Sequence, residues 1–226
     1  GGNESEYITR HILAGLGHLA KLTKDKIDPN RGHQIAVTGI PFLDRKFLEQ
    51  YKIRTQDFKT TDKLVWLNPN SDLHYLYTRS FYLKNYPLSD TLTKTTKRYL
   101  ETAKTDWLGY SLYEKGLAAL TLHRFGEKES AKKILESLKE TASNNEDWGM
   151  YWIANKAGWH WYQAPIETQA LLIEAFTEVL DDTKSVDAMK VWLLKNKQTK
   201  NWPTTKSTTE AIYALLLQGN DWLSVK

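Results

Sequence analysis

The sequence of 226 residues contains no cysteine. This absence excludes disulfide bonds, thiolate zinc sites and a cysteine nucleophile within these residues. It does not identify a cellular compartment, because exported and cytosolic proteins can both lack cysteine. The opening "GGNESEY" has no initiator methionine and no signal peptide. We therefore expect these residues to be a fragment of a longer chain.

Long apolar runs and blocks of like charge are also missing. The longest apolar runs, such as "ALLLQ" at 214–218, fall far short of the about 20 residues that cross a bilayer, so no membrane contact is expected. The 31 basic and 27 acidic residues leave a net charge of +4, but the lysines are scattered along the chain. A nucleic-acid partner is not expected either, because binding to phosphates needs clustered positive charge.

Motifs for catalysis and for cofactor binding are absent as well. The histidines form no H-E-x-x-H pattern, and no serine lies in a G-x-S-x-G context. Gly15 and Gly17 lie inside the helical pattern "LAGLGHL" with no preceding strand, so they indicate close helix packing rather than a phosphate loop. We predict no catalytic residue, no cofactor and no metal site, and hence no enzyme.

Amphipathic and all-round apolar helices alternate along the chain. Residues 91–107 carry one apolar stripe at spacings of three and four, whereas residues 109–125 are apolar around most of the circumference and end at Gly126. Residues 127–142 return to one narrow stripe. The stripe of 91–107 consists of Leu92, Thr96, Tyr99, Leu100, Ala103 and Trp107, and that of 127–142 of Ala131, Ile134, Leu135 and Leu138. The alternation predicts buried helices covered by surface helices.

The same alternation extends in both directions. Pro165 opens an apolar helix over 166–180, because its fixed φ suits the first helical position. An amphipathic helix at 185–196 and a buried helix at 208–217 follow, the former with Val186, Met189, Trp192 and Leu193 on one side. Toward the N-terminus we expect an apolar helix at 6–22, an amphipathic helix starting at Pro41 and a buried aromatic helix at 71–86.

The buried helices share a short pattern. Aligned on its threonine, the pattern has a mostly small residue two positions later and an apolar residue three positions later. The aligned sets are Thr9, Thr78, Glu114, Thr168 and Thr209, then His11, Ser80, Gly116, Ala170 and Ala211, then Ile12, Phe81, Leu117, Leu171 and Ile212. Small residues suit positions where helices cross closely. The alternative is that any buried helix contains threonine and alanine somewhere.

An irregular repeat of one inner and one outer helix predicts an all-α fold, either an α/α toroid or an open superhelical solenoid. We favour a toroid, partial or complete, formed by residues 1–226 as a single domain. Five inner and about four outer helices are too few to close the ring. The first helices of the toroid are therefore expected to lie outside this sequence.

Aromatic residues interrupt the helices at 147–163, "DWGMYWIANKAGWHWYQ". They flank the turn-like "ANKAG" at 154–158, so we predict a β-hairpin whose aromatic side chains cap one end of the helices. Trp152, Trp159 and Trp161 are candidates for an interaction surface. The alternative is that these rings only cover the open end of the core.

Three stretches carry a resemblance to a known family. They are "GGNESEYITRHILAGLGHL" at 1–19, "WYQAPIETQALLIEAF" at 161–176 and "NWPTTKSTTEAIYALLL" at 201–217. In this order they resemble the helical thioester-type, complement-component-like domain of bacterial, Bacteroidetes-type alpha-2-macroglobulin-like proteins. The resemblance implies an α/α toroid within a very large chain that inhibits endopeptidases by trapping them, in the periplasm or at the cell surface.

The family's chemistry lies in a Cys-Gly-Glu-Gln-type motif, whose Cys and Gln side chains form an internal thioester. That motif has no counterpart here, because the sequence lacks cysteine. It lies upstream, or this member lacks it. The resemblance therefore implies a non-catalytic scaffold whose partners are the other domains of the parent chain and, through the full-length protein, the target proteases.

Two other classes stay open. Toroids also host glycoside hydrolases and polysaccharide lyases, in which tryptophans stack on sugars beside two carboxylates, here Asp147, Glu114 or Glu167. Glu114 and Glu167 lie in first turns of helices, however, where the helix dipole favours a carboxylate without any catalytic task. The third class is a protein-interaction module that uses the aromatic hairpin.

Overall fold

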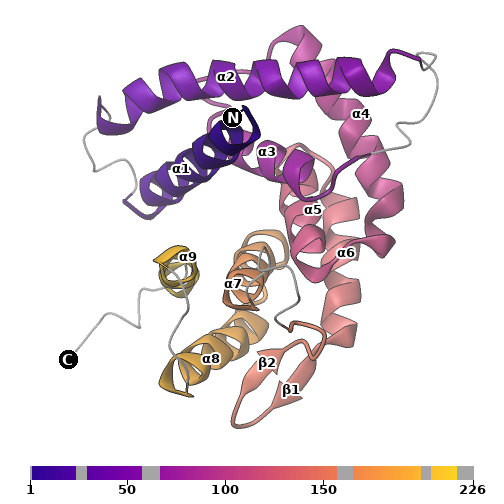
Figure 1. Cartoon of the computed structure of the whole chain (residues 1–226). Coiled ribbons are helices and arrows are strands. Elements are labelled where there is room, and N and C mark those ends of the chain that lie inside the picture. The colour runs from indigo at the N-terminus through magenta and orange to yellow at the C-terminus, as the bar shows by residue number, and fades with distance from the viewer. Residues whose placement is uncertain (1, 24–29, 58–66, 157–164, 200–204, 218–226) are drawn as a thin grey trace. The chain divides into compact units, whose positions relative to one another are not determined.

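The computed structural model describes residues 2–23, 30–57, 67–156, 165–199 and 205–217 (Figure 1). Apart from one antiparallel pair of short strands, the regular structure in these ranges is helical. The prediction of an all-α fold is confirmed. The contacts divide the chain into two compact units, residues 1–109 and residues 110–226, which we call the N-terminal unit and the C-terminal unit. A single toroid over residues 1–226 stays a prediction.

The N-terminal unit contains α1 (Gly2–Thr23), α2 (Asn30–Thr55), α3 (Ser71–Ser80) and α4 (Asp90–Asp106). Helix α1 packs against α2 and α3, and α2 also contacts α4. Aromatic rings fill the space between α2, α3 and α4, where the ring of Phe47 lies 4.3 Å from that of Tyr75 and 4.6 Å from that of Tyr99. Burial of such large rings supplies much of the free energy of a small core.

Pro41 lies inside α2 and does not start it, so the predicted helix start is wrong. A proline in a helix interior removes one hydrogen bond and costs roughly 3 kcal/mol. Buried side chains continue on both sides of Pro41, with Ile40 before it and Leu43 and Phe47 after it. Their packing offsets the cost and carries the helix through the proline. Helix α3 is also shorter than predicted, because regular α-helix ends at Ser80 and turns follow.

The stripe predicted for α4 is confirmed, since all of its six members are buried. The helix begins with the Ser89 hydroxyl accepting a hydrogen bond from the Leu92 backbone N–H at 3.2 Å. A short 3₁₀ turn, Trp107–Gly109, follows its end. Helix α1 is less buried than predicted: its Ile12 side chain is 45% exposed. Among the described residues of this unit, only α2 and α3 pack extensively against α1.

The C-terminal unit contains α5 (Leu112–Arg124), α6 (Lys128–Thr141), α7 (Pro165–Ala175), α8 (Thr183–Thr199) and α9 (Thr205–Leu216). Helix α7 contacts α5 on one side and α9 on the other, while α6 packs on α5 and α8 packs on α7. Three helices thus form a row, α5–α7–α9, and two others flank it (Figure 1). The predicted alternation of inner and outer helices holds within this unit.

Small side chains lie where the row is tightest. A Cβ atom on Gly116 of α5 would lie 3.1 Å from Leu171 and 3.2 Å from Leu172 of α7. Ala170 of α7 and Ala211 of α9, the residues aligned with Gly116, are also buried. The close approach of these helices explains why the shared sequence pattern has a small residue at this position. Helix α9 is less buried than predicted, with Ile212 47% exposed.

The helix ends follow the sequence signals. Ser111 and Glu114 form a reciprocal capping box at the start of α5, with the Ser111 N–H donating to Glu114 at 2.9 Å. Gly126 after α5 has a φ of 95°, as expected for a glycine in the left-handed position. Pro165 is the first residue of α7. Helix α7 continues into a π-helical turn, Phe176–Leu180, which ends at Asp181 with a φ of 49°.

The strands lie earlier in the sequence than predicted. β1 (Ser143–Asn145) pairs with β2 (Gly149–Tyr151), so the turn falls at 146–148 and not at 154–158. The Asn145 side-chain oxygen accepts hydrogen bonds from the N–H groups of Asp147 and Trp148 at 2.8 and 3.0 Å. An Asn that bonds the backbone two residues ahead fixes this turn. The second half of the predicted hairpin, 157–163, lies outside the described residues.

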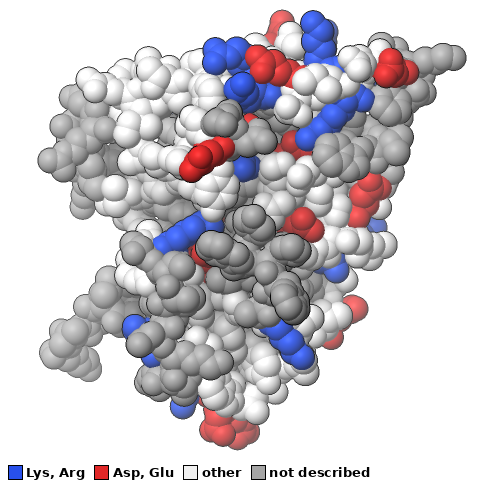
Figure 2. All heavy atoms as spheres, in the orientation of Figure 1, with Lys and Arg blue, Asp and Glu red and all other residues white. Residues whose placement is uncertain are grey.

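β2 packs against α8. No helix among the described residues has the length and apolar character that crossing a membrane requires. On the face drawn in Figure 2, Lys and Arg side chains lie among Asp and Glu side chains, and neither sign forms a continuous area.

We predict that Gly149→Ala lowers the free energy of unfolding of the C-terminal unit by about 3 kcal/mol or more. Gly149 has a φ of 74°, and a Cβ atom there would overlap the carbonyl oxygen of Ala188 in α8. The matched control is Gly126→Ala. Gly126 also has a positive φ, but an added Cβ would have no atom within 4 Å, so this substitution should lower the free energy of unfolding by only about 1–2 kcal/mol. Urea denaturation followed by tryptophan fluorescence measures both. Equal losses would contradict the close contact of β2 with α8.

Candidate functional site

Trp152 is part of the core and not of an exposed surface. Its side chain is 3% exposed, its ring lies 5.9 Å from that of Phe176, and its Nε1–H donates to the Leu138 carbonyl at 2.9 Å. The expectation that Trp152 belongs to an interaction surface is therefore wrong, because the ring holds the chain after β2 against α6. Trp159 and Trp161 lie outside the described residues.

The three carboxylates considered for an enzyme have separate local environments. Glu114 belongs to the capping box of α5. Glu167, at the start of α7, accepts hydrogen bonds from Lys206 and Ser207 of α9 at 3.1 and 3.2 Å. Asp147 lies exposed in the hairpin turn. Each carboxylate thus has a structural partner or a turn position that accounts for it.

A buried ionic network joins α5 to the end of α7. The Arg124 guanidinium donates to Glu174 at 2.7 Å and to Glu178 at 2.8 Å. The side chains of Arg124 and Glu174 are only 11% and 3% exposed. Two hydrogen-bonded ion pairs to one guanidinium use its planar fork well. Burial, and then the charge of Glu174, raise the pKa of Tyr213 on α9.

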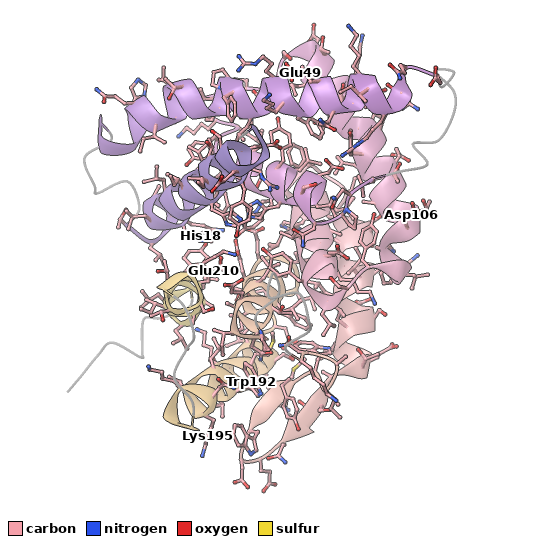
Figure 3. All side chains as sticks on the ribbon, viewed as in Figure 1. His18, Glu49, Asp106, Trp192, Lys195 and Glu210 are labelled. Atoms are coloured by element: carbon pink, nitrogen blue, oxygen red, sulfur yellow. The ribbon has the colours of Figure 1, made fainter. Side chains whose placement is uncertain are left out.

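A second polar contact fastens the start of α9 to the start of α7. Lys206 binds Glu167 at 3.1 Å and lies 3.9 Å from Glu210 one turn further along α9. Burial raises the pKa of Glu210 to about 8; Lys206 opposes this shift, while the charges of Glu167 and Glu174 add to it. The raised pKa favours the protonated form of Glu210 near neutral pH. Figure 3 labels it on α9.

We define these seven residues as the inner-row cluster of the C-terminal unit: Arg124, Glu167, Glu174, Glu178, Lys206, Ser207 and Glu210. Strongly shifted pKa values and buried charge are common at functional sites, although structural networks produce them too. The cluster links all three helices of the row through charge. In the described ranges, no group of three or more His, Asp or Glu side chains is arranged to hold a metal ion.

A pocket of about 740 Å³ opens at one end of the row. It lies between the start of α5, the end of α6 and the residues after β2, and its lining is about equally polar and apolar. The residues that line it are Tyr110, Ser111, Leu112, Tyr113, Lys115, Leu138, Thr141, Trp152, Ile153, Ala154, Asn155, Lys156 and Thr168. Its lining residues 152–156 belong to the segment 147–163 for which the sequence predicted a cap, and that cap stays a prediction.

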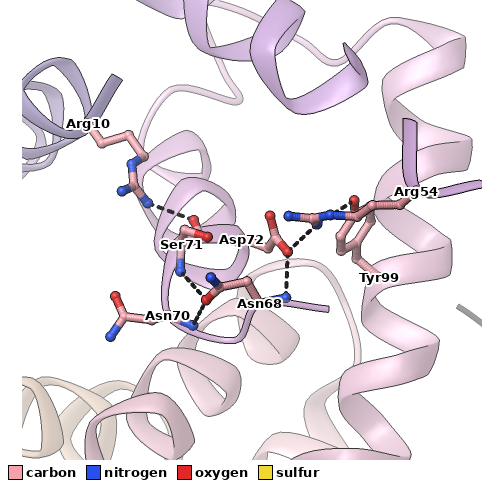
Figure 4. Close-up of polar contacts among 7 residues, drawn as sticks. All are labelled: Arg10, Arg54, Asn68, Asn70, Ser71, Asp72 and Tyr99. Carbon is pink, nitrogen blue, oxygen red and sulfur yellow. Dashed lines mark hydrogen bonds and ion pairs between the residues drawn. The ribbon is translucent and has the colours of Figure 1, made fainter. Parts of the chain in front are cut away.

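The N-terminal unit has its own buried ion pair (Figure 4). Arg54 at the end of α2 donates to Asp72 of α3 at 2.6 Å and to the Tyr99 hydroxyl of α4 at 3.2 Å. Asp72 also accepts a hydrogen bond from the Asn68 backbone N–H at 2.8 Å. The Asn68 side-chain oxygen accepts hydrogen bonds from the backbone N–H groups of Asn70 and Ser71 at 3.1 and 3.2 Å. Burial raises the pKa of Asp72, and Arg54 partly opposes that shift. This network joins three helices and fixes the start of α3.

Sequence reasoning missed both networks. The signal was present in "IETQALLIEAF", where Glu167, Gln169 and Glu174 interrupt a helix that is otherwise apolar all round. A charged residue on an all-round buried helix requires a partner, because burial of an unpaired charge is too costly. Gln169 shows the same effect, since its amide N–H groups donate to the carbonyls of Met150 and Met189 at 2.9 and 3.2 Å.

Comparison with known proteins adds no assignment. No protein-family model matches the chain, and no curated protein matches it. The likeness to alpha-2-macroglobulin-like proteins therefore rests on the three sequence stretches alone.

Arg124→Ala should lower the free energy of unfolding by about 3 kcal/mol or more, because it leaves the buried Glu174 without its counter-charge. The matched control is Lys139→Ala. Lys139 pairs with Asp182 at 2.8 Å, but its side chain is 52% exposed, so its loss should cost at most about 1 kcal/mol. Chemical denaturation of both variants tests this difference. Similar small losses would show that the inner-row cluster contributes little to stability.

The pKa of Glu210 predicts a pH dependence. The unfolded side chain loses its proton near the ordinary value of 4.5, whereas the folded chain keeps it up to about pH 8. The stabilising contribution is thus complete at low pH and is lost as the pH rises through the folded pKa. The free energy of unfolding should fall between about pH 5 and pH 8, and Glu210→Gln should reduce this fall.

Urea denaturation at several pH values measures the effect. The control is Glu136→Gln, since the Glu136 side chain is 56% exposed and its removal should leave the slope unchanged. A variant Glu210→Gln that keeps the full slope would show that another group titrates.

Proposed function

We propose that this chain is a non-catalytic scaffold within the helical thioester-type domain of an alpha-2-macroglobulin-like protease inhibitor. The sequence support is the set of three stretches at 1–19, 161–176 and 201–217 in the family's order. The structural support is the α5–α7–α9 row with α6 and α8 beside it, which is the layering that an α/α toroid repeats. This row is the observation on which the proposal mainly depends.

The finer architecture is part of the proposal. Helices α1, α3, α5, α7 and α9 would be inner helices of a toroid, and α2, α4, α6 and α8 outer helices. The apolar residues Ile12 and Ile212 occupy equivalent positions of the repeat in α1 and α9 and are about half exposed, whereas Leu117 and Leu171 at the same position of α5 and α7 are buried. Further inner helices of the parent chain would cover these faces.

In this role the chain shields a reactive centre and does not react itself. An internal thioester is consumed by water unless packed helices exclude solvent, and a trap must release it when a protease cleaves elsewhere in the molecule. Residues 1–226 supply neither the thioester cysteine nor a catalytic residue in this account. They transmit the change of shape as rigid packed helices, in a protein that acts outside the cytoplasm.

The alternative of a toroid carbohydrate enzyme receives no support from the described residues. Glu114 and Glu167 are each engaged in contacts that hold helices together, and Trp152 is buried. The aromatic surface that a sugar would need is therefore reduced to residues such as Trp148, which is 39% exposed on the hairpin.

The proposal predicts that the full-length parent protein traps proteases. After incubation with a broad-specificity serine protease, the enzyme should keep its activity on a small chromogenic peptide but lose most of its activity on a large protein substrate, because an enclosed active site excludes only the larger molecule. A protease whose nucleophile is blocked beforehand is the control, since it cannot trigger the change of shape.

Incubation with methylamine and mass spectrometry form the second arm. An adduct on a glutamine outside residues 1–226 would show a working thioester, and protection without an adduct would indicate a noncovalent trap. Unchanged cleavage of the protein substrate at a molar excess of the parent protein would contradict the proposed function.

A further inference from the structure

The N-terminal unit contains a groove of about 610 Å³ between α2 and the chain that leads into α4. We call it the α2–α4 groove. Its lining comes from α2, from Arg79 of α3 and from the segment before and at the start of α4. The residues are Ile40, Pro41, Asp44, Arg45, Leu48, Glu49, Lys52, Arg79, Tyr86, Pro87, Ser89 and Leu92. Its volume lies within the range of small-molecule sites, about 300–1,000 Å³.

The walls of the groove are mostly apolar. Ile40, Pro41 and Leu48 form the α2 side, and Pro87 and Leu92 face them from the other element. The two prolines and the Tyr86 ring are rigid side chains, so the groove loses little conformational entropy when a ligand binds. Such walls suit an aliphatic or aromatic body.

Polar groups at the groove are few and concentrated. Arg79 donates from Nε to Asp44 at 3.0 Å and from Nη2 to the Pro87 carbonyl at 3.4 Å. Asp44 also accepts the Tyr75 hydroxyl at 2.5 Å, which fixes the carboxylate in place. The Arg79 side chain is only 3% exposed, and its buried Nη1 atom has no hydrogen-bond partner among the described residues.

A buried guanidinium donor without an acceptor is unusual, because buried polar groups in folded proteins nearly always have a partner. The Arg79 guanidinium presents donors in a rigid fork that matches a carboxylate. An incoming oxygen atom would complete its hydrogen bonds. Because Arg79 lines the groove, a ligand there that carries an acceptor is favoured, and an anionic acceptor most strongly.

The charges around the groove point to a single negative charge. Arg45, Lys52 and Arg79 are basic lining residues, and Asp44 and Glu49 are acidic ones, which leaves a net charge of +1. Figure 3 labels Glu49 on α2. Ser89 and Leu92 place the first turn of helix α4 at the groove, where Asp90 and the Ser89 cap already balance the helix dipole, so the attraction for an anion rests on the basic side chains.

We propose that the α2–α4 groove binds an organic monocarboxylate with an apolar body. The apolar body lies between the side chains of α2 and Pro87, and the carboxylate accepts a hydrogen bond from Arg79. The site is independent of protease trapping, because it lies within the N-terminal unit and uses neither the inner-row cluster nor any thioester. A small free acid is the expected source of the carboxylate, and the free end of a peptide is the alternative source.

The test uses the 226-residue chain and 4-phenylbutyrate as the probe, followed by isothermal titration calorimetry. A ligand of this size should bind with a dissociation constant of about 1 mM or below. The uncharged 4-phenylbutyramide has the same body and should bind at least about fivefold more weakly. Equal affinity of acid and amide, or no binding of the acid at about 10 mM, would overturn the proposal.

Two exposed lysines of the N-terminal unit form a matched pair of variants. Lys52→Glu reverses a charge at the groove and should weaken binding of the acid at least about fivefold. Lys97→Glu makes the same change on α4 at a residue that does not line the groove, and should change affinity by less than about twofold. Equal effects would mean that only the overall charge matters, and would contradict a site in the groove.

Arg79→Lys keeps the positive charge but removes the fork of donors, and should weaken the acid more than the amide. Because Arg79 is buried, circular dichroism must show that this variant is folded; the lysine pair decides the question if it is not. The tripeptide Gly-Gly-Phe with a free or an amidated C-terminus tests the other source. At least about tenfold tighter binding of the free tripeptide than of 4-phenylbutyrate would support the carboxylate site and overturn the free acid as its ligand.

Discussion

The C-terminal unit depends on how closely α7 can approach its two neighbours. Gly116 lets α5 lie against Leu171 and Leu172, and the residues at the equivalent position of α7 and α9 are alanines. All three positions are buried, and packed cores accommodate added volume poorly, so we expect a larger side chain at any of them to be destabilising. The ion pairs of the inner-row cluster lie between these same helices. They join the three helices through charge, in addition to the apolar packing.

Buried ion pairs accompany the close packing of the row. Replacement of such networks by apolar side chains often leaves stability unchanged or improved, so their presence is weak support for stability alone. The two ion pairs of Arg124, with Glu174 and with Glu178, connect α5 to the end of α7. In the N-terminal unit, hydrogen bonds among Arg54, Asp72 and Tyr99 likewise join three helices that also pack through aromatic rings.

Much of the fold was predictable from the sequence, because helix periodicity and helix-end signals are local. The stripes of α4, α6 and α8, the capping residues of α5 and the proline at the start of α7 all lie where the pattern placed them. Pro41 was misread because the rule for a helix start is local, whereas the packing of Ile40 and Phe47 that keeps α2 continuous is not. The hairpin was predicted too late in the sequence because the aromatic residues around 154–158 suggested a turn there. The turn at 146–148 depends on the side chain of Asn145, which is a weaker sequence signal.

The site was less predictable than the fold. Tryptophan is common both in interfaces and in cores, and the sequence around Trp152 does not show that its side chain is buried. The inner-row cluster needs partners far apart in the chain, such as Arg124 with Glu174, and only their charge on apolar helices gave a hint. An experimental structure of the full-length parent protein by electron cryo-microscopy tests the central claim most directly. The account predicts that α5, α7 and α9 line the inside of a closed two-layered ring of helices within a larger multidomain chain. A parent protein in which these helices form an open array, or in which no further domains surround them, would contradict it.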